Sequence, residues 1–411
     1  MSSKKSLRVV FVNRFFYPDH SATAQILSDV AQYLSQEGFS VRVITSRLLY
    51  SDPSRQLEKV ETWEGVTINR VSTTCFGRSS LIGRALDYLT FYLSSFFSVL
   101  KHARDGDMVI AKTDPPLIGT TVGLAARIKG ARTGNWFQDV YPEVAEATGM
   151  KLPSIGMHLL KWMRGRSIDK AAINIAIGDL MAEKLMRERA APEKIKVIPN
   201  FADDISLQPN PSGWQDLRKE WGFSECDFVV GYSGNLGRAH DVETILGAAE
   251  ALRDDARIKF LFVGGGHQRR VVEDACAERD LTNMYFRPYE PRDRIALSLS
   301  VPDIHWISLK PAFEGLIVPS KLYGIAAVGR PVLMIGARDG EIGRLVEKFG
   351  FGITVMPGDV EAAVSEITRL SLAAEGLHEM KQHAREFVDR AASRRSSLVV
   401  WRDALIELAD A

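Results

Sequence analysis

The sequence predicts an α/β protein with two doubly wound parallel sheets. Short apolar runs alternate with helical patterns, and the alternation starts again after residues 208–213 (QPNPSG), which are rich in turn formers. Most apolar runs lead into glycines or polar residues, as strands do where a parallel sheet carries its ligand loops. The 411 residues suit two domains of roughly 200 residues each.

We place the domain boundary near residue 205. Residues 1–205 then form the N-terminal domain, and residues 206–389 form the C-terminal domain. The end of the chain has helical patterns, and we expect the last helix, about 390–411, to pack back on the N-terminal domain.

Composition and cysteine usage narrow the function classes. A formal net charge of +1 excludes a globally basic nucleic-acid binder, so no nucleic-acid partner is expected. Cys75, Cys226 and Cys276 are too scattered for a disulfide framework or a zinc site, which favours a reducing cytoplasm. No run approaches the roughly 18 apolar residues that span a bilayer. We expect a cytoplasmic protein, soluble or peripheral on the cytoplasmic membrane.

The chain begins with a strand, a loop, a helix and a second strand. We expect the strands at 7–13 and 41–45 and the helix at 23–36, which is typical of a doubly wound sheet. The loop between them lies at the carboxyl end of the first strand. Its candidate acceptor-binding residues are His20, Ser21 and Thr23, although Ser21 serves equally well as a helix cap.

Two segments of the first half combine aromatic and basic residues. Residues 84–102 form a helix whose apolar residues cover much of its circumference, and residues 151–170 repeat the combination. Either these helices are buried, or they lie against a membrane with their basic ends on lipid headgroups. The aromatic residues of the first segment are Tyr88, Phe91, Tyr92, Phe96 and Phe97.

Polar residues follow two further strands of the first half. A strand at 108–111 ends at KTDPP, which contains Thr113 and Asp114, and another strand ends near Asp139. Asp139 and Glu143 therefore emerge where α/β active sites lie, and a carboxylate there can orient or deprotonate an acceptor hydroxyl. Asp139 equally suits the cap of the next helix. We count Thr113, Asp114 and Glu143 as acceptor-binding candidates and Asp139 as a catalytic candidate.

The second half opens with glycine-rich turns. A strand at 228–232 runs into SGNLGRAH, where Gly234 and Gly237 let a ligand approach the backbone and Arg238 can pair with phosphate. The strand at 260–263 leads into three glycines, and the strand at 285–289 brings rings that could flank a base. The candidate donor-binding residues of these turns are Gly234, Asn235, Gly237, His240, Gly264, Gly265, Arg287 and Tyr289, with Arg238 as a catalytic candidate.

The stretch FEGLIVPSKLYGIAAVGRP, residues 313–331, organises the second half. Pro319 and Ser320 start a helical pattern, and Lys321 adds a positive charge to the helix end, which favours a phosphate. Glu314 lies just upstream, where a carboxylate can accept hydrogen bonds from sugar hydroxyls. The stretch predicts a nucleotide-sugar site with Glu314 as a catalytic candidate. The alternative is an ordinary loop-to-helix junction with a surface lysine.

These motifs resemble a known family. SGNLGRAH, FVGGG, the 313–331 stretch and VIPN, together with TDPPL and FQDVYPE in the first half, resemble a glycosyltransferase of family 4 with the GT-B fold. Within that family the chain looks like the bacterial branch that makes exopolysaccharide, colanic acid and O-antigen. The resemblance covers essentially the whole chain.

The resemblance implies two Rossmann-like domains facing a cleft, the first binding acceptor and the second the nucleotide sugar. It implies a retaining, metal-independent hexosyl- or N-acetylhexosaminyl-transferase that uses an NDP-sugar, a UDP-sugar being favoured, as co-substrate and needs no cofactor. The acceptor would be a glycan or a polyprenyl-diphosphate-linked sugar. Two other hypotheses are a UDP-N-acetylhexosamine 2-epimerase-like enzyme and a non-catalytic sugar-nucleotide-binding assembly protein.

The chain departs from the family pattern at three positions. The second glutamate of the family falls at Gly324, and the arginine and lysine of the nucleotide domain fall at Asn235 and His240. We expect Arg238 to take over the phosphate role with His240 assisting.

Overall fold

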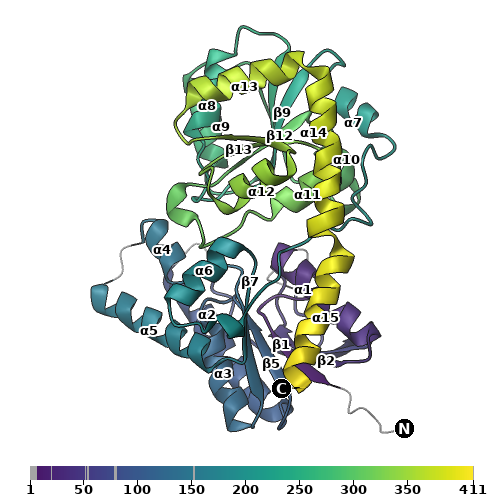
Figure 1. Ribbon diagram of the computed structural model, residues 1–411. Helices are drawn as coiled ribbons and strands as arrows, with labels where there is room; N and C mark the ends of the chain where they lie inside the picture. The colour runs from purple at the N-terminus through teal and green to yellow at the C-terminus, as the bar shows by residue number, and fades with distance from the viewer. Residues whose placement is uncertain are drawn as a thin grey trace. The chain divides into compact units, whose positions relative to one another are not determined.

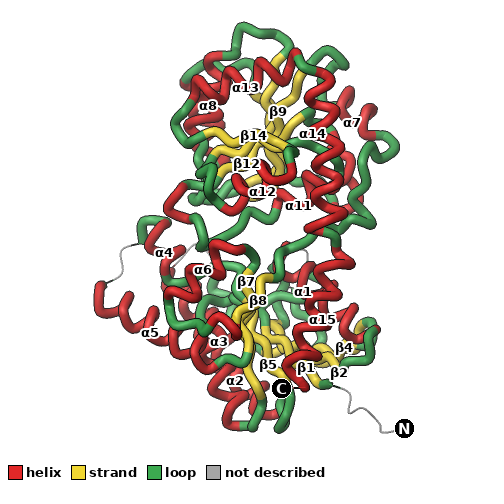
Figure 2. Tube along the Cα trace, in the orientation of Figure 1, coloured by secondary structure: helices red, strands yellow, loops and turns green. Residues whose placement is uncertain are grey.

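The structure is a computed structural model, and it describes residues 7–19, 21–50, 52, 55–77, 81–150 and 153–410. The chain divides into two compact units, each with a sheet at its centre and helices around it (Figure 1, Figure 2). Unit 1 comprises Met1–Pro199, Gly315–Ile317 and Ser397–Ala411, and unit 2 comprises Asn200–Glu314 and Val318–Ser396. The chain thus leaves unit 1 after Pro199, whereas the sequence predicts a boundary near residue 205.

The sheet of unit 1 has eight strands in the described residues, in the order β3-β4-β2-β1-β5-β6-β7-β8. Neighbouring strands run parallel, except that β3 and β4 are antiparallel. Because the strand order reverses at β1, the crevice for a ligand is expected outside the carboxyl ends of β1 and β5. The strands are β1 (Arg8–Val12), β2 (Ser40–Ser46), β3 (Val60–Trp63), β4 (Val66–Val71), β5 (Met108–Lys112), β6 (Arg132–Trp136), β7 (Ile173–Ala176) and β8 (Ile195–Val197).

Apolar strands and aromatic packing form the core of unit 1. Strand β1 is a continuous apolar run from Val9 to Val12, as expected of a parallel strand covered on both faces. Trp401 of the last helix lies 4.4 Å from Trp136 and 6.1 Å from Phe11 between ring centroids. The helices are α1 (Ala22–Gln36), α2 (Leu81–His102), α3 (Ile118–Ile128), α4 (Glu143–Ala147), α5 (Ser154–Lys170), α6 (Asp179–Arg187) and α15 (Arg394–Asp410).

Unit 2 repeats the doubly wound plan. In its described residues six parallel strands follow the order β11-β10-β9-β12-β13-β14, which reverses between β9 and β12. The predicted α/β class with two parallel sheets is confirmed. The strands are β9 (Phe228–Asn235), β10 (Ile258–Gly265), β11 (Met284–Arg287), β12 (Ile304–Ser308), β13 (Val332–Ile335) and β14 (Gly352–Val355). The helices are α7 (Trp214–Glu220), α8 (Glu243–Ala251), α9 (Arg269–Glu278), α10 (Ile295–Ser300), α11 (Lys321–Ala327), α12 (Glu341–Phe349), α13 (Val360–Leu372) and α14 (Ala374–Phe387).

The aromatic helix α2 faces the protein on one side and solvent on the other. Phe91 is fully buried, whereas Phe97 is 64% exposed. The solvent side carries an apolar stripe of five side chains, which are Ile82, Leu86, Leu89, Leu93 and Phe97. Their spacing of three or four residues puts them on one face of the helix. Neither this helix nor any other in the described part of the chain is long and apolar enough to cross a membrane.

Candidate active site

Two glycine turns of unit 2 lie against each other at the carboxyl ends of β9 and β10. Gly234 pairs with Gly264 in the strand register, and both have positive φ angles, +126° and +127°. A Cβ at Gly264 would overlap the carbonyl of Gly234, so glycine is required there. Strand β9 continues through Asn235, so Gly234 and Asn235 end the strand instead of following it.

Lys321 reaches these turns from the start of α11. Its Nζ lies 3.2 Å from His240 Nε2 and 5.0 Å from the centre of the Tyr232 ring. A Cβ at Gly234 would lie 2.9 Å from Lys321 Cε, so this glycine leaves space for the lysine chain. Burial lowers the pKa of Lys321 to about 8. Within the described ranges no carboxylate pairs with the ammonium, which is therefore a cation without an anionic partner.

His240 lies behind Lys321 and is only 7% exposed. Its Nδ1 is 2.6 Å from the carbonyl oxygen of Ser308, at the end of β12. Burial, and then the charge of Lys321, lowers the pKa of His240 to about 3. Both ring nitrogens are thus engaged inside unit 2, and the imidazole is neutral.

Glu314 lies at the first turn of α12. Its Oε2 accepts a hydrogen bond from the backbone N–H of Glu341 at 3.2 Å, and its Oε1 is buried without a partner among the described residues. Burial is the main cause that raises the pKa of Glu314 to about 7. A carboxylate with one unused oxygen suits a ligand that donates hydrogen bonds, such as a sugar hydroxyl.

The remaining donor-site candidates divide into exposed and engaged groups. Asn235, Arg238 and Ser320 are exposed, and Ser320 makes no capping bond at the start of α11. Tyr289 is 59% exposed and packs against Gly265, where a Cβ would lie 3.0 Å from its ring.

Three candidates face the interior of unit 2. Pro319 is buried, and the carbonyl of Gly237 accepts a hydrogen bond from Gln268 Nε2 at 2.5 Å. The Arg287 guanidinium turns to Trp221, to whose carbonyl it donates at 3.1 Å.

The position that the family pattern gives to a second glutamate has apolar neighbours. A Cβ at Gly324 would meet Leu207 at 3.5 Å and Leu299 at 3.6 Å. Both are ordinary van der Waals contacts, and Gly324 is half-buried. The side chains nearest to this position are therefore apolar.

A small cavity opens at the carboxyl ends of β5 and β6 in unit 1. Its volume of about 20 Å³ is enough for one water-sized group. Thr120 Oγ1 and Arg164 Nε line it and are buried without a hydrogen-bond partner among the described residues. Its other lining residues are Ala111, Thr113, Leu117, Ile118, Gly119, Asn135, Phe137, Asp139, Tyr141 and Ser167.

Asp139 is the acidic residue of this cavity. Burial, and then the neighbouring Asp114, raises the pKa of Asp139 to about 6, although Lys112 acts in the opposite direction. Thr113 lies beside it and accepts a hydrogen bond from the backbone N–H of Gln138 at 2.8 Å. Thr113 and Asp139 thus line the same cavity, after the ends of the neighbouring strands β5 and β6.

Lys112 is a buried cation that sequence reasoning missed. It is fully buried, donates to the carbonyl of Thr23 at 2.7 Å, and lies 3.8 Å from the centre of the Trp136 ring. Burial lowers its pKa well below the ordinary lysine value, while Asp114 and Asp139 act in the opposite direction. Its place in KTDPP, directly before two polar candidates, was the available indication.

The loop after β1 and the start of α1 carry the acceptor-binding candidates His20, Ser21 and Thr23. His20 lies outside the described residues. Ser21 starts α1 without a capping bond, and its Oγ is buried without a partner among the described residues. Its backbone N–H donates to Asp19 Oδ1 at 2.8 Å. The backbone carbonyl of Thr23 accepts a hydrogen bond from Lys112.

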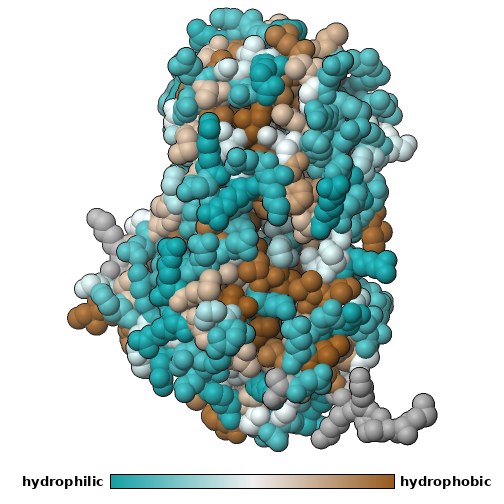
Figure 3. All heavy atoms as spheres, in the orientation of Figure 1, coloured by the Kyte–Doolittle hydropathy of each residue, from teal (hydrophilic) through white to brown (hydrophobic). Residues whose placement is uncertain are grey.

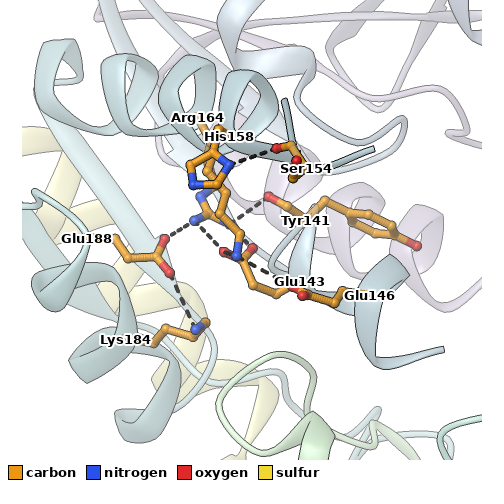
Figure 4. A network of polar contacts seen from close by, with 9 residues as sticks. Tyr141, Glu143, Glu146, Ser154, His158, Arg164, Lys184 and Glu188 are labelled. Carbon is orange, nitrogen blue, oxygen red and sulfur yellow. Dashed lines mark hydrogen bonds and ion pairs between the residues drawn. The ribbon is translucent and has the colours of Figure 1, made fainter. Parts of the chain in front are cut away.

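Glu143 belongs to an ion-pair network in unit 1, which Figure 4 shows. Arg164, only 4% exposed, binds both oxygens of Glu143, one of them at 2.9 Å, and also pairs with Glu188. The same guanidinium donates to the carbonyl of Tyr141 at 2.7 Å. Glu143 therefore has a cationic partner already, and the network fixes the loop that carries Tyr141.

Each unit contributes groups suited to chemistry of its own. In the described residues, unit 2 offers an ammonium without an anionic partner and a carboxylate with one unbonded oxygen, and unit 1 offers a carboxylate beside a small cavity. No group of three or more histidine, cysteine or acidic side chains within the described ranges is arranged to hold a metal ion.

Curated relatives cover most of the chain. WcaI of Escherichia coli (strain K12), named for glycosyl transfer in colanic acid biosynthesis, is 27% identical over 398 residues, 93% of this chain and 96% of WcaI. WbjE of Pseudomonas aeruginosa, named as a glycosyltransferase, is 28% identical over 325 residues, 74% of this chain and 78% of WbjE. The GDP-mannose:cellobiosyl-diphosphopolyprenol alpha-mannosyltransferase of Xanthomonas oryzae pv. oryzae (strain PXO99A) is 24% identical over 378 residues, 90% of this chain and 88% of that enzyme. No protein-family model matches the chain.

Solved structures share the fold over nearly the full length. Sucrose-phosphate synthase from Thermosynechococcus elongatus matches with a TM-score of 0.78 at 15% identity, over 98% of this chain and 99% of the other. HepE of Anabaena, solved in complex with UDP-glucose, matches with a TM-score of 0.70 at 14% identity, over 98% and 99% of the two chains. The chain is a glycosyltransferase with the GT-B fold, and it resembles the family 4 enzymes of bacterial cell-surface polysaccharide synthesis.

Proposed function

We propose that this glycosyltransferase transfers a sugar from an NDP-sugar bound by unit 2 to a hydroxyl of an acceptor bound by unit 1. The observation that carries the proposal is the ammonium of Lys321, half-buried beside two glycine turns with no carboxylate next to it in the described part of unit 2. Withdrawing an unpaired cation from water is costly, and a diphosphate would offset that cost with charge-assisted hydrogen bonds.

The proposed reaction exchanges one bond at the anomeric carbon. The bond to the diphosphate oxygen breaks, and its electron pair leaves on the nucleoside diphosphate, next to Lys321 and the exposed Arg238. The acceptor oxygen forms the new bond, and its proton passes to the Asp139 carboxylate. The unused oxygen of Glu314 accepts a hydrogen bond from a donor-sugar hydroxyl. We expect retention of configuration, which requires the acceptor oxygen to bond on the face that the diphosphate leaves. We also expect no metal requirement, since Lys321 and Arg238 supply the positive charge that a metal would.

The relatives suggest which donors to test. The Xanthomonas enzyme is named for GDP-mannose and a diphosphopolyprenol acceptor, and the HepE structure contains UDP-glucose. UDP-sugars are our first choice and GDP-mannose the second. The favoured acceptor is a polyprenyl-diphosphate-linked sugar or another glycan of cell-surface polysaccharide synthesis.

The test is turnover of UDP-glucose, UDP-N-acetylglucosamine and GDP-mannose with a lipid-linked sugar acceptor. We expect release of nucleoside diphosphate, an acceptor heavier by one sugar, and activity that persists in EDTA. Lys321→Ala should abolish turnover, whereas Lys219→Ala, at an exposed position of α7, should not. Normal turnover and donor affinity in Lys321→Ala would refute the phosphate role. An isomerised sugar formed without acceptor would identify an epimerase, and binding without turnover an assembly protein.

We further propose that unit 1 contacts the inner face of the cytoplasmic membrane through three neighbouring helices. Helix α3 packs against both α2 and α5. We call their outer surface the α2–α3–α5 face. Its exposed apolar side chains are Ile82, Leu86, Leu89, Leu93 and Phe97 on α2, Leu124 and Ile128 on α3, and Ile155, Leu159 and Trp162 on α5. Figure 3 shows hydrophobic atoms, in brown, at the outer end of α5.

The excess of basic residues on these helices favours a lipid surface as the binding partner of this face. The exposed charged residues within the three helices are Lys101, Arg127, Arg166 and Lys170 on the basic side and Asp169 on the acidic side. An apolar surface with a basic excess suits anionic lipid headgroups. The exposed apolar residues of this face differ from the aromatic residues that the sequence suggests for membrane contact, because Phe91 of that group lies in the core.

Vesicle flotation tests the contact. Wild type should float with vesicles that contain phosphatidylglycerol and less with pure phosphatidylcholine. Leu93→Glu with Phe97→Glu should reduce flotation, whereas Leu372→Glu, a 66% exposed position on α13, should leave it unchanged. Unchanged flotation of a folded Leu93→Glu/Phe97→Glu variant would exclude this face as the lipid surface.

A further inference from the structure

We propose that His240 is a positioning residue for Lys321. Its neutral imidazole accepts a hydrogen bond from the ammonium and so aims the remaining N–H groups at the donor diphosphate. The identity of that ligand rests on the proposed function, whereas the histidine–lysine pair is a feature of unit 2 itself.

The contacts of the ring fix its tautomer. Nδ1 lies 2.6 Å from the Ser308 carbonyl oxygen, which can only accept, so Nδ1 carries the hydrogen. Nε2 lies 3.2 Å from the Lys321 ammonium, which can only donate, so Nε2 accepts. Only the neutral Nδ1–H form satisfies both contacts. The depressed pKa of His240, about 3, agrees with that form.

Neighbouring groups hold the ring in place. Its centroid lies 5.9 Å from that of Tyr232 at an interplanar angle of 77°. The backbone carbonyl of His240 accepts from Gln268 Nε2 at 3.0 Å. Ser308 is itself anchored, because its Oγ donates to the Asp241 carbonyl at 2.8 Å. Contacts with Tyr232 of β9 and Ser308 of β12 therefore fix the position of the acceptor nitrogen Nε2.

The fixed acceptor orients the ammonium. Of the three N–H groups of Lys321, one points to Nε2, and the Tyr232 ring lies 5.0 Å from the nitrogen. The other two have no hydrogen-bond acceptor among the described residues. Gly234 leaves room for the lysine chain itself, because a Cβ there would lie 2.9 Å from Lys321 Cε. Without the acceptor, a flexible lysine would have to be ordered by the ligand alone.

Two substitutions separate positioning from packing. In His240→Asn, the side-chain amide can replace the Nδ1 bond to Ser308 but is too short to reach Lys321. In His240→Gln, the longer side chain can place its amide oxygen, an acceptor, near the position of Nε2. We expect His240→Asn to weaken UDP binding about tenfold, the cost of a hydrogen bond to a charged group. His240→Gln should bind UDP nearly as wild type does. Adding His240→Asn to Lys321→Ala should cause no further loss.

Titration calorimetry with UDP, and with GDP beside it, gives these affinities, with thermal melting as the folding control. Wild-type affinity in His240→Asn, or equal losses in the Asn and Gln variants, would overturn the positioning role. If the wild-type protein binds neither UDP nor GDP, both the proposed donor site and the proposal that His240 directs Lys321 to a diphosphate are overturned.

NMR of the wild-type protein tests the pair without any ligand. Long-range ¹⁵N–¹H correlations should show one histidine, absent in the His240 variants, as the neutral Nδ1–H tautomer from pH 6 to 8. An Nε2–H tautomer or an imidazolium at this residue would refute the hydrogen bond from Lys321 whatever the nucleotide experiments give.

Discussion

Glu314 and Gly340 are matched in shape, because a Cβ at Gly340 would overlap the Glu314 carboxylate. The missing side chain lets Oε2 reach the backbone N–H of Glu341 at 3.2 Å, which leaves the buried Oε1 for a ligand. The position of the carboxylate is therefore set by a residue 26 positions further along the chain (340 − 314 = 26).

Gly340→Ala should displace Glu314 and slow the reaction. A misplacement of about 1 Å can cost about 100-fold in rate, and we expect a loss of that order in turnover. UDP affinity should change little, since Lys321 is untouched. Steady-state kinetics and calorimetry measure the two effects. The matched control is Gly376→Ala, where a Cβ meets nothing within 4 Å. Equal turnover in both variants would show that the Glu314 position does not matter.

Turnover should depend on pH through two groups of unit 2. The pKa of Glu314 is raised to about 7, so its carboxylate forms as pH rises through 7, and the rate should rise with it. The pKa of Lys321 is lowered to about 8, so its charge is lost as pH rises through 8, and the rate should fall. A bell-shaped profile of kcat/KM between these values is expected.

Substitutions assign the two limbs of the profile. Lys321→Arg should remove the alkaline limb, because a guanidinium stays charged. Glu314→Gln should move the acid limb to about 6, the raised pKa of Asp139. Limbs that stay in place in both variants would mean that other groups titrate.

Much of this arrangement could be predicted from local sequence. Glycines directly after apolar runs marked the ends of β9 and β10, and Pro319–Lys321 marked the start of α11. The hairpin of β3 and β4 was missed, although Glu64 and Gly65, both with positive φ, form the tight turn typical of such pairs. The local pattern was present there and went unused.

The contacts that define the site could not be predicted in this way. Lys321 meets His240 across 81 residues of sequence, and Lys112 meets Thr23 across 89. Such pairs depend on how the strands are ordered, which a single sequence does not reveal residue by residue. The role of Glu143 shows the same limit, because its partner Arg164 lies on a different helix.

Arg164→Met should destabilise unit 1 strongly. The guanidinium pairs with the buried Glu143 and with Glu188, and its removal leaves both carboxylates without their main partner. Breaking a buried pair in this way costs about 3–5 kcal/mol in the free energy of unfolding. Denaturant unfolding measures the loss.

Two further variants test the cause. Arg187→Met is the control, because Arg187 is 80% exposed and its pair with Glu183 should contribute less than about 1 kcal/mol. Adding Glu143→Gln and Glu188→Gln to Arg164→Met should recover part of the stability. No recovery would assign the loss to packing of the arginine chain.

Asp139→Asn should slow transfer to the acceptor without weakening the donor. Asp139 lies at the cavity of unit 1, whereas the groups proposed to hold the diphosphate belong to unit 2. Loss of a general base typically costs about 10²–10⁴-fold in rate, and we expect a fall within that range with UDP affinity unchanged. Asp169→Asn, at an exposed position of α5, should keep wild-type turnover.

The pH dependence separates a base from a residue that only shapes the cavity. The pKa of Asp139 is raised to about 6, so the limb near pH 6 that we expect in Glu314→Gln should disappear when Asp139→Asn is added. A structural role would lower the rate equally at every pH and leave that limb in place. Persistence of the limb in the double variant would therefore remove Asp139 from the chemistry, even if the rate falls.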